Sequence, residues 1–219
     1  MLKTADHEML NEYAGQVQEA LNDIFLHEDT FDKLLKMATL IREAFSRGNK
    51  LIIMGNGGSA TDADHIASEF VGKFGQPKRQ GYPAIALTNP AFLTAWANDF
   101  NYNTTFSRAV NAYIADGDVV WVLSTSGNSR NIITAIDYLR ARQEKTFSVI
   151  GFLGYALRSP AMDNSYPGVD VNIRVPLYHP YMTSQEAEET MLTAIIQDVH
   201  RVLYHMIVMH VDMELATKS

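Results

Sequence analysis

The stretch Lys50-Leu51-Ile52-Ile53-Met54-Gly55-Asn56-Gly57-Gly58-Ser59 runs from an apolar segment into a small polar loop. A second stretch of the same kind is Asp118-Val119-Val120-Trp121-Val122-Leu123, followed by Ser124-Thr125-Ser126-Gly127-Asn128-Ser129. Each predicts a buried strand, a tight turn and the start of a helix. This arrangement directs backbone N–H groups and the positive end of a helix dipole at one spot, which suits phosphate. The sequence therefore predicts that the chain binds a phosphorylated small molecule.

Strand-like and helix-like segments alternate around these two loops. Strands separated by helices indicate parallel βαβ units, so the predicted fold class is α/β with a parallel sheet. We expect a single domain, with a helical extension over 6–47 that breaks near 28–30, a core over 48–182 and a long final helix. The predicted strands are 50–54, 83–87, 118–123, 146–150 and 170–175, and the predicted helices after the extension are 59–74, 90–98, 104–114, 129–142 and 183–211.

Composition excludes several classes of protein. The 219 residues are 47% hydrophobic, carry a formal net charge of −7 and include no cysteine. A negative chain lacks the basic face that non-specific nucleic-acid binding requires, and the absence of cysteine removes disulfides and thiolate metal sites. The N-terminus is polar and no apolar run approaches the roughly 20 residues that span a bilayer. We expect a cytoplasmic protein that contacts neither nucleic acid directly nor a membrane.

The first loop has two alternative interpretations. It reads as G-x-G-x-x-A through Ala60, a variant of the dinucleotide-binding fingerprint of an oxidoreductase, but that fingerprint needs an acidic residue about 20 residues further on. The second predicted strand ends at Leu87-Thr88-Asn89, without an acid. The loop is also compatible with a plain glycine-rich turn. The second loop is harder to explain without a ligand, although Ser129 could simply cap the next helix.

His65 and Glu69 are the first candidate pair for chemistry. Their spacing of four places both on one face of the predicted helix 59–74, where they can share a metal or a substrate. The alternative is an ordinary surface hydrogen bond. His200, His205 and His210 step by five residues, which scatters them around the last helix, and we expect no ligand set from them.

Several motifs together resemble the phosphoheptose isomerases, which are sugar isomerase (SIS) domain proteins acting on sedoheptulose 7-phosphate. The resemblance runs from about residue 10 to residue 205. The two loops are typical of the SIS fold, and His65, Glu69 and Asn98-Asp99 are typical of the heptose branch. The motifs are Gly55-Asn56-Gly57-Gly58-Ser59, Asp64-His65-Ile66-Ala67-Ser68-Glu69-Phe70, Gly81-Tyr82-Pro83-Ala84-Ile85-Ala86-Leu87, Ala97-Asn98-Asp99-Phe100, Ser124-Thr125-Ser126-Gly127-Asn128-Ser129 and Ser184-Gln185-Glu186.

The resemblance implies a flavodoxin-like sheet of five parallel strands and a homotetramer with active sites at subunit interfaces. It implies that Glu69 moves a proton between C1 and C2 of the sugar, and that a zinc ion is held by His65, Glu69 and Gln185. The implied phosphate ligands are Ser124, Thr125, Ser126 and Ser129, and the other implied substrate contacts are Asn56, Gly57, Gly58, Ser59, Lys73, Asn98, Asp99 and Gln185.

One departure from the family pattern concerns its second catalytic group, a histidine eight residues after the glutamine. Counting from Gln185 leads to Thr193, and a threonine cannot replace an imidazole as an acid or base. Glu189 lies on the same helical stripe, between these two positions, and is a candidate substitute; the alternative is an exposed glutamate in an acidic run. A milder departure is Lys73, where the family commonly has arginine.

We therefore expect a phosphosugar isomerase that converts D-sedoheptulose 7-phosphate to D-glycero-D-manno-heptose 7-phosphate through an enediol, with Glu69 and Glu189 as its catalytic groups. The alternative is a non-catalytic SIS module that binds a sugar phosphate or a protein, similar to the SIS protein that binds a replication initiator. Retention of Glu69 and Gln185 favours the enzyme, because a pure scaffold has no use for them.

Overall fold

The computed structural model describes residues 4–76, 78–142, 146–157, 166–177 and 185–216 of the chain. A five-stranded sheet lies at its centre, and every strand pair is parallel. The strand order is β2-β1-β3-β4-β5, which is the flavodoxin-like order. The predicted fold class is confirmed. The strands are β1 (Leu51–Met54), β2 (Ala84–Ala86), β3 (Val119–Ser124), β4 (Ser148–Leu157) and β5 (Val171–Leu177).

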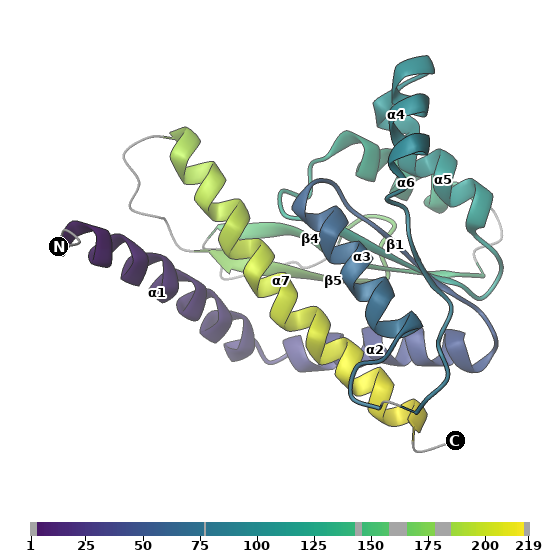
Figure 1. The fold of residues 1–219 in the computed structure, drawn as a ribbon, viewed down its shortest axis with the longest axis horizontal. Coiled ribbons are helices and arrows are strands. Elements are labelled where there is room, and N and C mark those ends of the chain that lie inside the picture. Colours follow the sequence, from purple (N-terminus) through teal and green to yellow (C-terminus); the bar gives the residue numbers. More distant parts are fainter. Residues whose placement is uncertain (1–3, 77, 143–145, 158–165, 178–184, 217–219) are drawn as a thin grey trace.

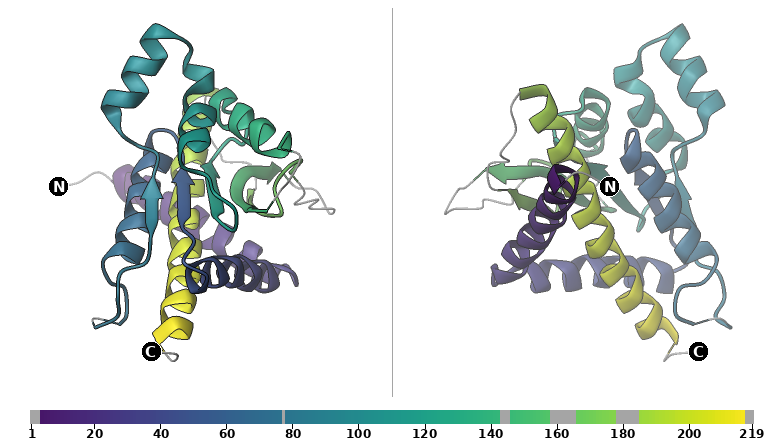
Figure 2. Two further views of the ribbon diagram at one scale, coloured as in Figure 1. Left: turned by 90° about the vertical axis from the view of Figure 1, so that its right-hand side faces the viewer. Right: turned by 60° about the vertical axis from the view of Figure 1, so that its left-hand side comes forward.

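Helices cover both faces of this sheet, as Figure 1 shows. Four lie on one face: α1 (Thr4–Leu26), α2 (Thr30–Ser46), α3 (Gly58–Val71) and α7 (Gln185–Ala216). The other face is covered by α5 (Thr105–Tyr113) and α6 (Arg130–Arg140), while α4 (Pro90–Asp99) stands away from the body and has no buried residue (Figure 2).

The core is split into two layers because the strands are buried on both faces. All residues of β1 and β3 are buried, and alternate side chains point to opposite layers. Ile53 and Trp121 join the layer under α2, α3 and α7, whereas Ile52 and Val120 join the layer under α5 and α6. The predicted strands and helices are all present, but β4 continues seven residues and α7 five residues beyond their predicted ends.

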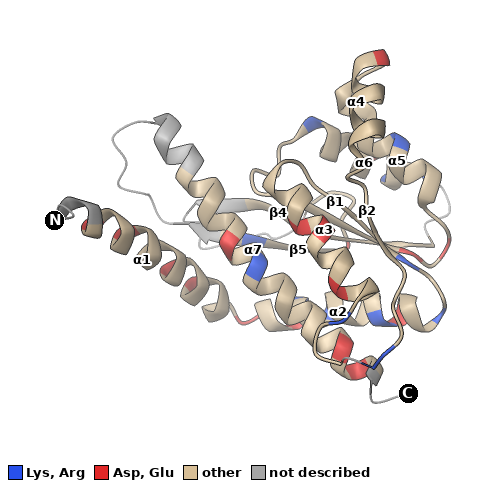
Figure 3. Cartoon of the chain, viewed as in Figure 1, with Lys and Arg blue, Asp and Glu red and all other residues tan. Residues whose placement is uncertain are grey.

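The charge distribution agrees with the acidic composition. Helix α1 carries five acidic residues and no lysine or arginine, so its exposed face is negative (Figure 3). Among the described helices, none combines the length and the apolarity needed to cross a bilayer.

Candidate active site

The two glycine- and serine-rich loops follow β1 and β3, which are neighbours at the centre of the sheet. Both loops therefore lie at the carboxyl edge of the sheet, where ligands bind in open α/β folds. Gly57 has a φ of +54°, a conformation that favours glycine. A Cβ added to Gly55 would lie 2.6 Å from the carbonyl oxygen of Ser59, so the turn into α3 requires glycine there as well.

The second loop folds on its own hydroxyl groups. The backbone N–H of Gly127 donates to Oγ of Ser124 at 3.1 Å, and the N–H of Asn128 donates to Oγ of Ser126 at 3.2 Å. Ser129 occupies the cap position of α6 without bonding through its side chain. The first turn of α6 contains Arg130 and no acidic residue, so nothing there neutralises the positive end of the helix dipole. The loop retains the properties of an anion site.

A pair of asparagines joins the two loops. Asn56 and Asn131 exchange side-chain hydrogen bonds, with 2.9 Å between donor and acceptor in each direction. Tyr102 donates to Oδ1 of Asn56 at 2.7 Å, and Asn131 is only 1% exposed. Oδ1 of Asn56 thus has two donors, and the amide keeps one N–H for a ligand. Asn131 was not among the predicted site residues.

A second group of side chains lies on facing positions of α3 and α7. Nε2 of His65 is 3.0 Å from Oε1 of Glu69, which confirms that the predicted pair shares one helix face. The hydroxyl of Tyr204 lies 3.0 Å from Nδ1 of His65, and the ring of His205 packs edge-on against that of His65 with 5.2 Å between centroids. Both ring nitrogens of His65 are therefore held in place.

Burial shifts the pKa values of two members of this group, Tyr204 and His205. The pKa of the Tyr204 hydroxyl is raised, mainly by burial, so the phenol remains protonated and can donate to Nδ1 of His65. The pKa of His205 is lowered by burial and then by its neighbour His65, so its imidazole is neutral at pH 7 and can accept a proton.

The structure separates this group from Thr193 and Glu189. His205 follows them by twelve and sixteen residues in α7, which corresponds to about 18 Å and about 24 Å along the helix axis. Gln185 lies about 30 Å away by the same measure. The side chains of Gln185 and Glu189 lie outside the described residues. Within one chain the backbone positions of Gln185 and Glu189 are therefore far along α7 from this group, and their grouping with His65 and Glu69 stays a prediction.

A different glutamine and histidine have the expected spacing of eight residues. Gln197 precedes His205 by eight positions, and its amide packs against Gly58, where an added Cβ would lie 2.1 Å from Oε1. Gln197 therefore contacts the first loop, while His205 contacts His65. The sequence-based prediction did not include Gln197 and set His205 aside with the other histidines of the last helix, although the spacing of eight was available to find both.

Three other predicted residues lie apart from the two loops. Asn98 and Asp99 are exposed at the end of α4 and bond to each other at 2.8 Å. Lys73 is exposed just after α3.

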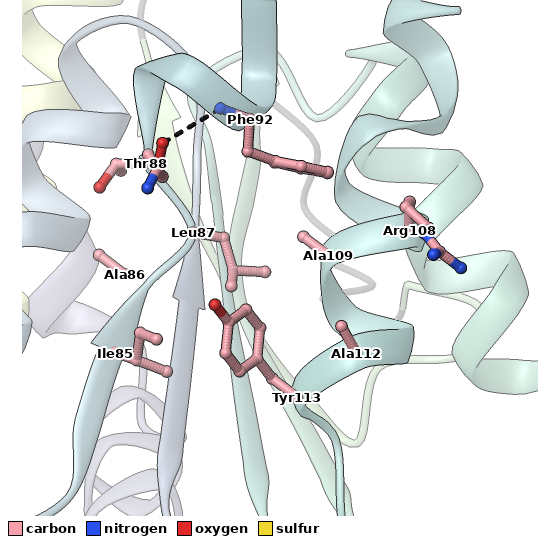
Figure 4. A pocket seen from close by; sticks show the side chains of 10 residues that line it. Ile85, Ala86, Leu87, Thr88, Phe92, Arg108, Ala109, Ala112 and Tyr113 are labelled. Carbon is pink, nitrogen blue, oxygen red and sulfur yellow. Dashed lines mark hydrogen bonds between the residues drawn. The ribbon is translucent and has the colours of Figure 1, made fainter. Parts of the chain in front are cut away.

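A cavity of about 540 Å³ lies beside β2, between this strand and α5, as Figure 4 shows. Its walls are mainly apolar, and three of its polar side chains are engaged in other contacts. Asn89 caps α4 by accepting from the N–H of Phe92 at 3.1 Å, Thr88 donates to Asp64 at 2.6 Å, and Arg108 lies over the ring of Trp96. The cavity is separate from the two loops and from the His65–Glu69 pair.

A parallel sheet of this order, with two loops suited to an anion at its carboxyl edge, is the arrangement of a ligand-binding α/β protein. Residues 12–154 match the family model described as SIS domain. The phosphoheptose isomerase of Crocosphaera subtropica is 41% identical over 82% of this chain and 81% of its own length. That of Vibrio cholerae is 37% identical over 94% of this chain and 95% of its own.

A solved structure agrees with these relatives. The phosphoheptose isomerase from Neisseria gonorrhoeae matches with a TM-score of 0.71 and 27% identity, over 94% of this chain and 99% of that one. The chain belongs to the SIS-domain family and, within it, to the phosphoheptose isomerases.

Proposed function

We propose that this protein is an aldose–ketose isomerase that interconverts D-sedoheptulose 7-phosphate and D-glycero-D-manno-heptose 7-phosphate. The observation that carries the proposal is the group on α3 and α7, in which a carboxylate, Glu69, lies 3.0 Å from His65 while His205 packs against that histidine. An enediol mechanism needs a carboxylate near the carbon acid and a second group that handles the oxygen-bound proton.

Each step assigns one proton. Glu69 removes the proton from C1 of the ketose, which gives the enediolate, and the same carboxylate returns it to C2. The neutral imidazole of His205 accepts the proton of the C1 hydroxyl and donates it to the oxygen on C2. The sugar thereby becomes an aldose without net gain or loss of atoms. The lowered pKa of His205 supports this role, because a base must be unprotonated at working pH.

Gln197 and His205 take the roles that the sequence analysis gave to Gln185 and Glu189. They have the spacing of eight residues, and both side chains contact α3 or the loop before it. On this proposal the chain has not lost the second catalytic histidine, and Thr193 has no part in the reaction.

The phosphate is held by the second loop, through Ser124, Thr125, Ser126 and Ser129 and the N-terminus of α6. The free N–H of Asn56 and the first turn of α3, with Gly57, Gly58 and Ser59, bind the sugar hydroxyls. The acid-free first turns of α3 and α6 support this assignment. Asn98, Asp99 and Lys73 remain predicted substrate contacts.

A zinc ion is the predicted cofactor. Within the described residues no group of three or more metal-ligand side chains is arranged to hold a metal, and His65 and Glu69 bond to each other instead. The types of donor in His65 and Glu69, an imidazole and a carboxylate, nevertheless suit zinc, and we propose that these two residues contribute to holding it, while His205 keeps its nitrogen for proton transfer. Such an ion would polarise the sugar carbonyl as a Lewis acid.

A homotetramer in the cytoplasm completes the proposal. Glu69 lies eleven residues beyond Gly58 on α3, about 16 Å along the axis, so the phosphate end and the proton-transfer end of the site are well separated in one chain. Elements of a second subunit can close this separation. Exposed apolar side chains such as Met209 and Met213 on α7 support contacts between subunits.

The test is an NMR assay of the zinc-supplemented protein with sedoheptulose 7-phosphate in D₂O, together with the Glu69→Gln variant. We expect the unaltered protein to form the aldose phosphate and to incorporate deuterium, and the variant to do neither while still binding the sugar phosphate. Binding without turnover or exchange by the unaltered protein would instead support a non-catalytic SIS module.

A further inference from the structure

A buried ion pair joins the segment after α3 to the last turns of α7. The side chains of Arg79 and Asp212 are 2% and 1% exposed, and Nε of Arg79 donates to Oδ1 of Asp212. The other carboxylate oxygen of Asp212 accepts the backbone N–H groups of Gly75 and Gln76, each at 2.9 Å. Burying two charges is costly unless their hydrogen bonds are satisfied, as they are here.

Two further hydrogen bonds of Arg79 reach α3, and a third goes to the carbonyl oxygen of Gln80 at 2.9 Å. Nη2 donates to the carbonyl oxygen of Glu69 at 2.6 Å, and Nη1 donates to the carbonyl oxygen of Phe70 at 2.9 Å. Carbonyls in the last turn of a helix have no partner within the helix, and a cation there also interacts favourably with the helix dipole. The guanidinium lies 4.8 Å from the ring centre of Tyr82, which fixes its plane. A single side chain thus connects the backbone of Glu69 to α7.

This connection lies next to the proposed acid–base group. His205 precedes Asp212 by seven residues, about two helical turns, so both point from the same side of α7 toward α3. On the other side of the group, Arg201 of α7 pairs with the buried Asp62 of α3 at 3.1 Å. Two ion pairs to α7, one from α3 and one from the segment after it, therefore flank His65, Glu69 and His205, and Figure 1 shows α3 and α7 side by side.

We infer that Arg79 and Asp212 are positioning residues for the isomerase reaction: the pair fixes the end of α3 against α7 and so sets the distance between the Glu69 carboxylate and the His205 imidazole. The inference rests on the proposed function. An apolar contact would hold the helices together without fixing the orientation of the Glu69 backbone. The planar guanidinium fixes that orientation because it donates to the carbonyl oxygens of Glu69 and Phe70.

The deciding variant is Arg79→Lys. Lysine keeps the charge opposite Asp212 but loses the fork that reaches both carbonyls of α3. We expect kcat per folded molecule to fall about 10- to 100-fold, because an active group displaced by about 1 Å costs that much. KM should stay within about twofold, because the phosphate loops are not touched. The control is Lys50→Met, which breaks the partly buried pair with Asp118 remote from α3 and α7 and should lower the melting temperature without lowering kcat per folded molecule.

A measurement independent of activity accompanies the kinetics. In the protein with labelled histidines, the ring protons of His65 and His205 should give a nuclear Overhauser effect that weakens in Arg79→Lys and persists in Lys50→Met. If kcat and this effect both survive Arg79→Lys, the inference is overturned. If the unaltered protein proves inactive but the effect still weakens in the variant, the positioning role stands and the proposed function fails.

Discussion

The imidazole of His205 packs edge-on against that of His65, with ring centroids 5.2 Å apart, although the two residues belong to helices that are far apart in the sequence, α7 and α3. This contact brings the final helix into the same site as the helix that follows the first glycine-rich loop. It gives the site two imidazoles and one carboxylate on facing surfaces, a set that can move protons between carbon and oxygen.

We expect His205→Asn to reduce turnover of sedoheptulose 7-phosphate by a factor of about 100 or more, because general acid–base catalysis contributes about 10²–10⁴ in rate. Thr193→Ala and Glu189→Gln should leave kcat unchanged, since both positions lie far along α7 from His65. Steady-state kinetics on the three variants decides between the two versions of the site. Loss of activity in Glu189→Gln with retention in His205→Asn would restore the original assignment.

The sequence alone could predict the fold because its signals are local. Apolar runs ending in glycine and serine located β1 and β3 and the loops after them, and helical periodicity located the helices. Strand β4 was predicted only to residue 150, since Gly151 and Gly154 interrupt the apolar pattern, whereas the strand continues to Leu157 through an irregular register. His65 and Glu69 were predicted because their relation lies within one helix.

The remaining site residues depend on contacts between distant segments. His200, His205 and His210 do point in different directions around α7, as their spacing predicts. His205 alone still contributes to the candidate site, because its partner, His65, comes from α3. Asn131 and Arg79 were missed for the same reason, because each acts on a loop or helix outside its own element. Helical spacing within α7 could not show which of its faces meets α3.

Removal of zinc tests the metal proposal. We expect dialysis against a chelator to abolish isomerase activity and zinc addition to restore it, because the predicted ion polarises the sugar carbonyl. In His65→Ala the zinc content measured by atomic emission should fall well below one ion per chain, while His7→Ala, an exposed change on α1, should keep it. Full activity in metal-free protein would contradict the proposed ligand set.

Loss of the bond between the loops should weaken substrate binding. In Asn131→Ala, Asn56 loses one donor and one acceptor, and only the hydrogen bond from Tyr102 still orients its amide. One or two such hydrogen bonds are worth about 1–2 kcal/mol, so we expect KM for the sugar phosphate to rise about tenfold with a smaller change in kcat. Asn128→Ala is the matched control, because this exposed side chain lies in the same loop. Equal KM values for both variants would show that the asparagine pair does not order the loops.

Gly127 should be intolerant of a side chain for two reasons. Its φ is +67°, and an added Cβ would lie 3.0 Å from the backbone of Gly154 on the neighbouring strand. The carbonyl oxygen of Gly127 also accepts the hydroxyl of Tyr166 at 2.9 Å. We expect Gly127→Ala to weaken the binding of inorganic phosphate, measured by calorimetry. The melting temperature should fall only slightly. Unchanged phosphate affinity would mean that the second loop is not the phosphate site.

His200 makes the stability of the fold depend on pH. Burial lowers the pKa of its imidazole from an ordinary value of 6.5 to about 3, and its ring packs against Phe152 at 5.2 Å. Between these two pKa values the unfolded chain binds a proton that the folded chain does not, so the free energy of unfolding increases with pH there. The contribution is complete above the unfolded pKa and is lost as the pH falls toward 3.

One pKa unit corresponds to about 1.4 kcal/mol, so this residue should lower the free energy of unfolding by about 2 kcal/mol between pH 8 and pH 5. Urea unfolding at pH 8 and pH 5 measures this difference in the free energy of unfolding. The difference should be smaller by about 2 kcal/mol in His200→Gln, because a neutral amide has no proton to bind, and unchanged in His7→Gln. If the free energy of unfolding changed equally between the two pH values in His200→Gln and in the unaltered protein, the imidazole of His200 would already be protonated in the folded state at pH 5.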